Sequence, residues 1–368
     1  MSAAGSGPSP RAAVAAIDPY VPGAVPPAVE RALKLASNEN PYGPSPLAVE
    51  AARLALADVN RYPEAGAPTL RAKLASRLGV AADQILVGAG SDETLYLLAN
   101  TYLEPGRHAV MADPAYGIHR ISARAAGATI TQVPCLDGAH DLAAMAEAAR
   151  AAGAPGVLYV ANPHNPTGTV VAGDALTALV DAVPADWLVV VDEAYIDFVE
   201  TGARFSALEL LGRHPGLVVT RTFSKAYGLA GMRVGYAVAD ARVLEPVGRI
   251  RPPFNVSAPT LAAAAAALDD EAYLARTVAE TLASRAALTS ALDGLGLRHL
   301  PSQANFILVE DRDDWPAALA IDAVSVRPGA HLGVSGWARI SLPKPEDVER
   351  VVEVIAWALT VARADPAP

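Results

Sequence analysis

Short apolar runs alternate with helical patterns along most of the chain after residue 45. The segments 46–59, 67–80 and 91–103 carry apolar residues at helical spacing, so we expect an amphipathic helix in each. Gly79 is expected to end the second helix. Ser91 is expected to cap the third, with acidic residues following in its first turn.

Between these helices lie apolar runs with the character of strands that are covered on both faces, because they lack strict alternation. They occupy 84–90, 108–114, 128–134, 156–163, 187–195, 217–223 and 233–239. Strands that alternate with helices predict an α/β architecture with a mostly parallel sheet.

In such sheets ligands bind beyond the carboxyl ends of the strands. Five clusters of polar residues directly follow apolar runs and are therefore candidate site segments. They are 90–93, 113–116, 162–168, 192–195 and 222–225.

The pattern changes near residue 257. Long helices at 260–295 lead to three short apolar runs and a final helix at 345–362, which predicts a smaller α+β domain. We therefore expect an N-terminal arm over 1–40 with the first twelve or so residues disordered, a large cofactor-binding domain over 41–256, and a small C-terminal domain over 257–368.

Composition narrows the class of protein. The chain of 368 residues is 52% hydrophobic and can bury a sizeable core, while its net charge of -10 argues against nucleic acid or anionic membrane as a partner. The single cysteine, Cys135, excludes an internal disulfide framework and fits a reducing compartment. No segment has the length of a membrane span or the pattern of a secretory signal, so we expect a cytoplasmic protein. We expect no metal site.

Lys225 is one of only four lysines, and it lies in a glycine-spaced segment directly after an apolar run. A lysine that bonds to a carbonyl cofactor needs a pKa lowered by burial and by neighbouring cations. Thr222, Ser224 and Arg233 could bind a phosphate, and the helix start at 90–92 adds backbone N–H donors. An exposed surface lysine is the alternative.

Asp192 ends a very apolar strand, where an aspartate needs a partner. It could cap a loop, or it could pair with a pyridinium nitrogen and keep the ring an electron sink. Tyr195 and Asn165 could donate to a ring oxygen, and Tyr116 could either stack on the ring or be an ordinary core tyrosine. We expect His164 to be a loop residue.

These residues and the segments around them resemble the fold-type I pyridoxal phosphate-dependent aminotransferases, in particular the histidinol-phosphate aminotransferase group of histidine biosynthesis. The resemblance extends over almost the whole chain. It includes "KLASNENPYGPSP", "NRYPEAG", "GAGSDE", "NPHNPTG", "VDEAYIDF", "TFSKAYGLAGMRVGY", "PPFNVS", "SQANF", "VSVRPG" and "WARIS".

The resemblance implies a large domain with a mostly parallel seven-stranded sheet between helices. It also implies that Lys225 bonds to the cofactor aldehyde and moves the proton between substrate Cα and cofactor C4′. For the cofactor ring it implies Asp192 at the pyridinium nitrogen, Asn165 and Tyr195 at the ring oxygen, and Tyr116 stacked on one face. For the cofactor phosphate it implies a homodimer in which Tyr62 reaches across from the partner subunit, together with Ser91, Asp92, Thr222, Ser224 and Arg233. For the substrate it implies Arg339 at the α-carboxylate, Tyr20 and Arg327 at the side chain or its phosphate, and Asn38 in an N-terminal segment that closes over the site.

The implied reaction converts L-histidinol phosphate and 2-oxoglutarate into imidazole-acetol phosphate and L-glutamate. "ISLPKPEDV" and His164 depart from the group's pattern, and several stretches also resemble aromatic (phenylalanine) aminotransferases, which leaves the amino donor open. A decarboxylase such as the threonine-phosphate decarboxylases is a further alternative. A pyridoxal phosphate-binding regulator would need a DNA-binding domain that the first 40 residues are too short to form. "VGAGSDE" lacks the third glycine of a dinucleotide-binding loop.

Overall fold

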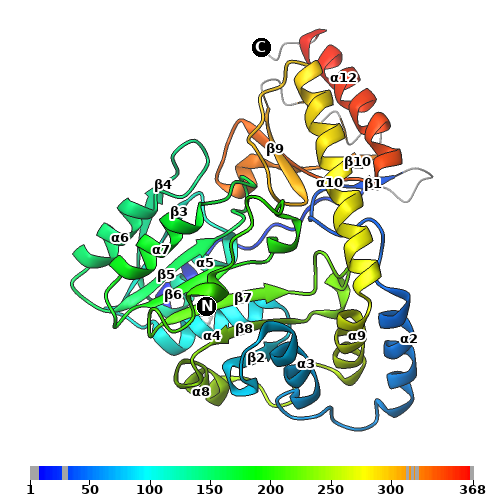
Figure 1. The fold of residues 1–368 in the computed structure, drawn as a ribbon. Coiled ribbons are helices and arrows are strands. Elements are labelled where there is room, and N and C mark those ends of the chain that lie inside the picture. Colours follow the sequence, from blue (N-terminus) through cyan, green and yellow to red (C-terminus); the bar gives the residue numbers. More distant parts are fainter. Residues whose placement is uncertain (1–7, 27–31, 312–314, 316–318, 320–322, 365–368) are drawn as a thin grey trace, which may run out of the picture.

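The protein is seen in a computed structural model that describes residues 8–26, 32–311, 315, 319 and 323–364 (Figure 1). Residues 1–7, where the sequence predicts disorder, lie outside the described residues. A short helix, α1 (Ala12–Ala15), precedes the main body of the fold.

A seven-stranded sheet forms the centre of the large domain, and its strand order is β2-β8-β7-β6-β5-β3-β4. β8 is antiparallel to both of its neighbours, while the other six strands run in one direction. The strands are β2 (Ile85–Gly88), β3 (His108–Asp113), β4 (Thr129–Pro134), β5 (Gly156–Ala161), β6 (Leu188–Asp192), β7 (Leu217–Thr222) and β8 (Gly235–Ala239). The mostly parallel α/β sheet predicted from the apolar runs is confirmed.

Helices cover both faces of this sheet, so alternate residues of one strand enter different cores. Leu188 and Val190 of β6 pack under α4 (Ser91–Tyr102), α5 (Gly117–Ala126) and α8 (Ala241–Ile250). Val189 and Val191 pack under α6 (Leu142–Ala151) and α7 (Gly173–Ala182) on the opposite face. Burial on both sides explains why the runs show no alternation in the sequence.

At the β2 end of the sheet, α2 (Pro46–Ala55), α3 (Pro68–Leu78) and α9 (Ala258–Asp269) share a core with β2 and β8. The first predicted helix ends earlier than expected, because a 3-10 turn replaces it at Leu56–Asp58. Gly79 ends α3 in the left-handed conformation, as predicted, with φ 70°. A glycine reaches this conformation without the steric cost of a Cβ.

The small domain has its own sheet and core. β9 (Phe306–Glu310), β12 (Trp337–Ser341) and β11 (Arg327–Pro328) form an antiparallel sheet, and β1 (Leu33–Lys34) pairs with β10 (Val324–Ser325). α10 (Glu271–Gly294) extends from α9 toward this domain, where it lies beside α12 (Val348–Ala364) (Figure 1). The boundary placed near residue 257 stays a prediction.

The prediction that Ser91 caps α4 is wrong. Gly90 holds the cap position with φ 88°, and Ser91 is the first helical residue. The chain turns sharply out of β2 there, in a conformation that strongly favours glycine. No helix in the described ranges is long and apolar enough to cross a membrane.

Gly235 and Gly248 offer a matched test of the packing between β8 and the start of α4. A Cβ on Gly235 would collide with backbone atoms of Gly90, Ser91 and Arg221, whereas one on Gly248 in α8 would meet nothing within 4 Å. We expect Gly235→Ala to lower the free energy of unfolding by about 1–3 kcal/mol. Gly248→Ala should raise it by roughly 0.5–1 kcal/mol through helix propensity. Urea denaturation would measure both, and an unchanged midpoint for Gly235→Ala would contradict the packing described.

Candidate active site

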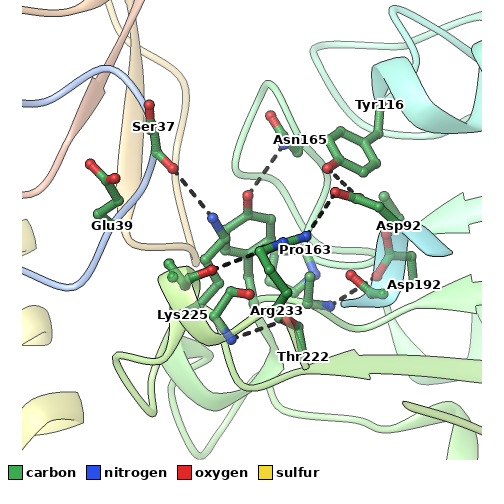
Figure 2. Close-up of a pocket in the computed structure, with 17 residues that line it drawn as sticks. Ser37, Glu39, Asp92, Tyr116, Pro163, Asn165, Asp192, Thr222, Lys225 and Arg233 are labelled. Carbon is green, nitrogen blue, oxygen red and sulfur yellow. Dashed lines mark hydrogen bonds and ion pairs between the residues drawn. The ribbon is translucent and has the colours of Figure 1, made fainter. Parts of the chain in front are cut away.

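The five predicted clusters meet around one cavity of about 320 Å³. Six strands point their carboxyl ends at the same edge of the sheet, and each cluster follows one of five of them. The volume is in the range of small-molecule sites. Side chains and backbone of the following residues line the cavity (Figure 2): Ser37, Glu39, Ser91, Asp92, Tyr116, Ala161, Pro163, Asn165, Asp192, Ala194, Tyr195, Thr222, Ser224, Lys225, Ala230, Gly231 and Arg233.

Lys225 lies in the turn after β7 and points its amine into the cavity. Its Nζ donates to the carbonyl oxygen of Ser37 at 3.3 Å and lies 5.8 Å from the centre of the Tyr195 ring. Burial, together with the positive charge of Arg339, lowers the pKa of Lys225 to about 8. With this pKa roughly a tenth of the amine is neutral at pH 7, far more than for an ordinary lysine, so it can act as a nucleophile or base.

Asp192 lies at the opposite wall, at the end of β6, and is buried. Its Oδ1 accepts from the Thr220 hydroxyl at 3.1 Å and from the Ala194 N–H at 3.2 Å. Its Oδ2 lies 3.5 Å from Nε2 of His119. Two hydrogen bonds therefore hold the carboxylate in a fixed orientation, with His119 close to its other oxygen.

His119 is a residue that the sequence did not indicate. It lies one turn after Tyr116 on α5, stacks on Tyr159 with ring centres 4.8 Å apart, and meets the edge of Tyr116. Nothing in the surrounding sequence marks it, since its contact with Asp192 arises only because α5 covers β5 and β6. The only local signal is the spacing of three residues from Tyr116, which places both side chains on one helix face.

One end of the cavity has the character of an anion site. The start of α4 presents backbone N–H groups, and Arg233 approaches it with Nη2 3.5 Å from Asp92 Oδ2. Tyr116 donates to the other Asp92 oxygen at 2.9 Å. The hydroxyl of Ser224 and that of Thr222, which accepts from the Ser224 N–H at 3.1 Å, complete this end.

A chain of hydrogen bonds connects the opposite end of the cavity to the small domain. The Tyr195 hydroxyl accepts from Asn165 at 3.3 Å and from Asn38 at 3.0 Å, so its own hydrogen is left to donate. Burial raises the pKa of Tyr195 to about 12, which keeps that hydrogen in place at neutral pH. Arg339 Nη1 donates to Asn165 Oδ1 at 2.6 Å.

Arg339 and Arg327 are buried, at 6% and 3% exposure, and stand opposite each other in the β12–β11 ladder. In the part of the chain that the structure describes, neither pairs with a carboxylate: Arg339 bonds Asn165 and the Ala36 carbonyl, and Arg327 bonds the Val21 carbonyl. Arg327 also lies 5.5 Å from the exposed ring of Tyr20. Two buried guanidiniums that face no carboxylate in the described residues could receive an anion.

Four predicted site residues besides Arg339 stand apart from the cavity lining. Asn38 reaches it only through Tyr195, Arg327 and Tyr20 lie behind Arg339, and Tyr62 is 81% exposed. Tyr62 stacks on Phe254 with ring centres 4.6 Å apart, away from the cavity of its own chain. His164 is buried against Thr167 and the Pro114 carbonyl and does not line the cavity.

Comparison with known proteins agrees with this geometry. The family model "Aminotransferase class I and II" matches residues 30–355. The chain belongs to this aminotransferase family. It is 45% identical to the histidinol-phosphate aminotransferase of Symbiobacterium thermophilum, over 95% of this chain and 98% of the relative.

Two further relatives are also named histidinol-phosphate aminotransferases. Histidinol-phosphate aminotransferase 2 of Pseudomonas aeruginosa is 44% identical over 93% of this chain and 95% of its own. The solved histidinol-phosphate aminotransferase of Sinorhizobium meliloti is a complex with pyridoxal-5'-phosphate. It is 30% identical, superposes with a TM-score of 0.82, and the match covers 91% of this chain and 92% of that one.

The residues of this cavity fit such a cofactor. A partly buried amine with a lowered pKa faces a carboxylate held by two hydrogen bonds, and both lie beside an anion-binding end. Between them, Tyr116 and Tyr195 supply an aromatic face and a hydroxyl donor. An aldehyde, a pyridinium nitrogen and a phosphate would each find a complementary group.

The lowered pKa of Lys225 predicts how capture of the cofactor depends on pH. Only the neutral amine attacks an aldehyde, so the rate at which cofactor-free protein captures pyridoxal phosphate should rise with pH and reach half its plateau near pH 8. Arg339→Met removes one cause of the low pKa and should move the midpoint upward. Stopped-flow absorbance would measure it, with the exposed Arg298→Met as control. A pH-independent rate would contradict this account of the amine.

Proposed function

We propose that this chain is a pyridoxal phosphate-dependent aminotransferase that acts on L-histidinol phosphate and 2-oxoglutarate. Membership of the aminotransferase family and the activity for which its relatives are named support the reaction type. The observation that carries the choice of donor is the pair of unpaired, buried arginines opposite each other in the small sheet, Arg327 and Arg339.

In the cofactor site, Asp192 would hold the pyridinium nitrogen, while Asn165 and Tyr195 would donate to the ring oxygen. Tyr116 would cover one face of the ring. Thr222, Ser224, Arg233 and the N–H groups at Ser91 and Asp92 would hold the phosphate. Pyridoxal phosphate, once bound, supplies the electron sink that acidifies the substrate Cα hydrogen.

Lys225 is the residue that would hold the aldehyde of the cofactor. When its amine is free and neutral, it would serve as the group that takes the proton from substrate Cα and returns it at cofactor C4′. Burial and Arg339 lower the pKa of this amine to about 8, so it can first accept and then release the proton near neutral pH. One side chain therefore serves as base and then as acid.

The two arginines select the donor by charge. L-histidinol phosphate has a phosphate ester where an amino acid has a carboxylate, and a phosphate dianion matches two guanidiniums better than a single negative charge does. Arg339 also binds the α-carboxylate of glutamate and 2-oxoglutarate. With a donor that lacks the phosphate, one buried cation stays unpaired, which costs binding energy.

A homodimer is part of the proposal. Tyr62 is highly exposed and points away from its own cavity, as a residue would that reaches the phosphate site of a partner. Large apolar side chains on α2 and in the turn that leads from it toward Tyr62 are also exposed, which is typical of a covered interface. They are Leu47, Leu54, Leu56 and Val59. The cytoplasmic location stays a prediction.

Substrate preference can be tested with a panel of donors. With 2-oxoglutarate as acceptor, kcat/KM for histidinol phosphate should exceed that for phenylalanine and tyrosine by at least about 100-fold. Arg327→Met should lower kcat/KM for histidinol phosphate by about 100-fold and change that for phenylalanine by less than about threefold, since only the phosphate needs the second cation. Arg298→Met on the same domain serves as control.

Two outcomes of this panel would replace the proposal. Preference for phenylalanine would assign the chain to the aromatic aminotransferases. Release of carbon dioxide without consumption of 2-oxoglutarate would assign it to the decarboxylases.

The role of Lys225 can be tested separately from the donor. Lys225→Ala should abolish the absorbance band of the lysine-bound cofactor and lower turnover by more than about a thousandfold, because both the covalent bond and the proton carrier are lost. Lys73→Ala, which removes a surface ion pair with Asp269, should change neither. A variant at position 225 that keeps both band and turnover would exclude the assigned role.

A further inference from the structure

A buried ion pair lies on the face of the sheet opposite the cavity. Arg221 donates from Nε and Nη2 to Oε2 of Glu193, at 2.9 and 2.8 Å. The Glu193 side chain has no exposed surface, and that of Arg221 has 14%. A buried pair of this kind needs every remaining polar atom satisfied to persist.

The pair is completed by the start of a 3-10 turn, η4 (Ala207–Leu210). The Ser206 hydroxyl lies 3.0 and 2.9 Å from the two Glu193 oxygens and accepts from Arg221 at 2.9 Å. The Ala207 N–H donates to Glu193 at 2.6 Å. We call Glu193, Arg221 and Ser206 the clamp; it joins the ends of β6 and β7 to a third segment of chain.

Alternation along the strands couples the clamp to the cavity. Asp192 lies on the same face of the sheet as Leu188 and Val190, the face covered by α5. Glu193, the next residue, therefore points to the other face. Thr222 lines the cavity, and Arg221 directly before it faces the other side of the sheet, as Glu193 does. Glu193 and Arg221 are therefore the chain neighbours of two cavity residues on adjacent strands.

The clamp lies where the backbone ladder between the two strands stops. The last pair in the β6–β7 register is Asp192 with Thr220, followed by one N–H bond from Glu193 to the Thr220 carbonyl. β7 continues beyond this point with β8 as its partner, through the pair of Thr222 with Gly235. Past the ladder, the clamp is the side-chain connection that holds the end of β6 to β7 and thus to the turn that bears Lys225.

We propose that the clamp is a positioning element that sets the separation between the Asp192 carboxylate and the Lys225 amine. This separation in turn sets the affinity for pyridoxal phosphate. It also sets the proton affinity of the nitrogen through which Lys225 would hold the cofactor. The inference rests on the proposed cofactor, not on the proposed donor. Neither Glu193 nor Arg221 touches the cavity, so both act through their neighbours. A displacement of the order of 1 Å at a reacting group can cost about 100-fold.

Single variants alone do not separate positioning from stability. Glu193→Gln leaves the buried guanidinium of Arg221 without a counter-charge, and Arg221→Met leaves the carboxylate of Glu193 without one. Either change would destabilise the fold and weaken cofactor binding at the same time. The double variant Glu193→Met with Arg221→Met removes both charges and keeps an apolar fill of similar volume. Replacement of a buried pair in this manner is often neutral for stability.

For the double variant we expect the Tm of the cofactor-free protein to return close to that of wild type. We also expect Kd for pyridoxal phosphate to stay raised by at least about tenfold, and the pH midpoint of the bound-cofactor absorbance to be displaced. Kd would be measured by fluorescence quenching and the midpoint by absorbance titration. A double variant with restored Tm, wild-type Kd and a wild-type midpoint would overturn the proposal.

The chain offers a matched control. Asp181 and Arg213 form a two-bond ion pair of the same type on the surface, half exposed and remote from the cavity. Asp181→Met with Arg213→Met should leave Kd and the midpoint unchanged.

If the Glu193 and Arg221 double variant does not regain its Tm, Ser206→Ala decides. It removes one hydroxyl from the clamp and should raise Kd about two- to threefold with a measurable shift of the midpoint; no change in either would overturn the proposal. Wild-type protein that does not bind pyridoxal phosphate would instead refute the proposed cofactor.

Discussion

The desolvated amine of Lys225 is the constraint on which the arrangement of the site depends. Water cannot stabilise its charge fully, and the nearby guanidinium of Arg339 disfavours that charge further, so the pKa falls to about 8. The fold therefore supplies a cavity that partly shields Lys225 from solvent at the end of β7, and it places a cation without a carboxylate partner, Arg339, behind that cavity. Both features follow from the packing of the small domain over the carboxyl edge of the large sheet.

The opposite wall balances this with negative charge that is held rather than solvated. Asp192 accepts from Thr220 of β7 and from Ala194 just after β6, and it faces His119 of α5. On the other face, Glu193 and Arg221 neutralise each other. Consecutive residues thus place one carboxylate in the cavity and the next in a closed ion pair, a direct result of strand alternation.

Much of this was readable from the sequence. Apolar runs followed by polar clusters located the sheet and its functional edge, and Lys225, Asp192, Asn165 and Tyr195 lie at that cavity as predicted. The sequence could not indicate contacts that depend on the order of strands and helices in space. His119 meets Asp192 only because α5 covers β6, and Ser37 reaches Lys225 from 188 positions away. Local propensity also misplaced the cap of α4, because the turn geometry at Gly90 outweighs the preference for serine.

The arginines that would recognise substrate are built on a different sheet, with a different core, from the residues that would hold the cofactor. Arg327 and Arg339 belong to one short ladder whose packing involves Ile307, Val309 and Ile340 rather than the seven-stranded sheet. Changes at Arg327 would therefore alter which anionic group is accepted while Arg339, which lowers the pKa of Lys225, stays in place. A scaffold divided in this way allows new amino donors to evolve while the shared chemistry is retained.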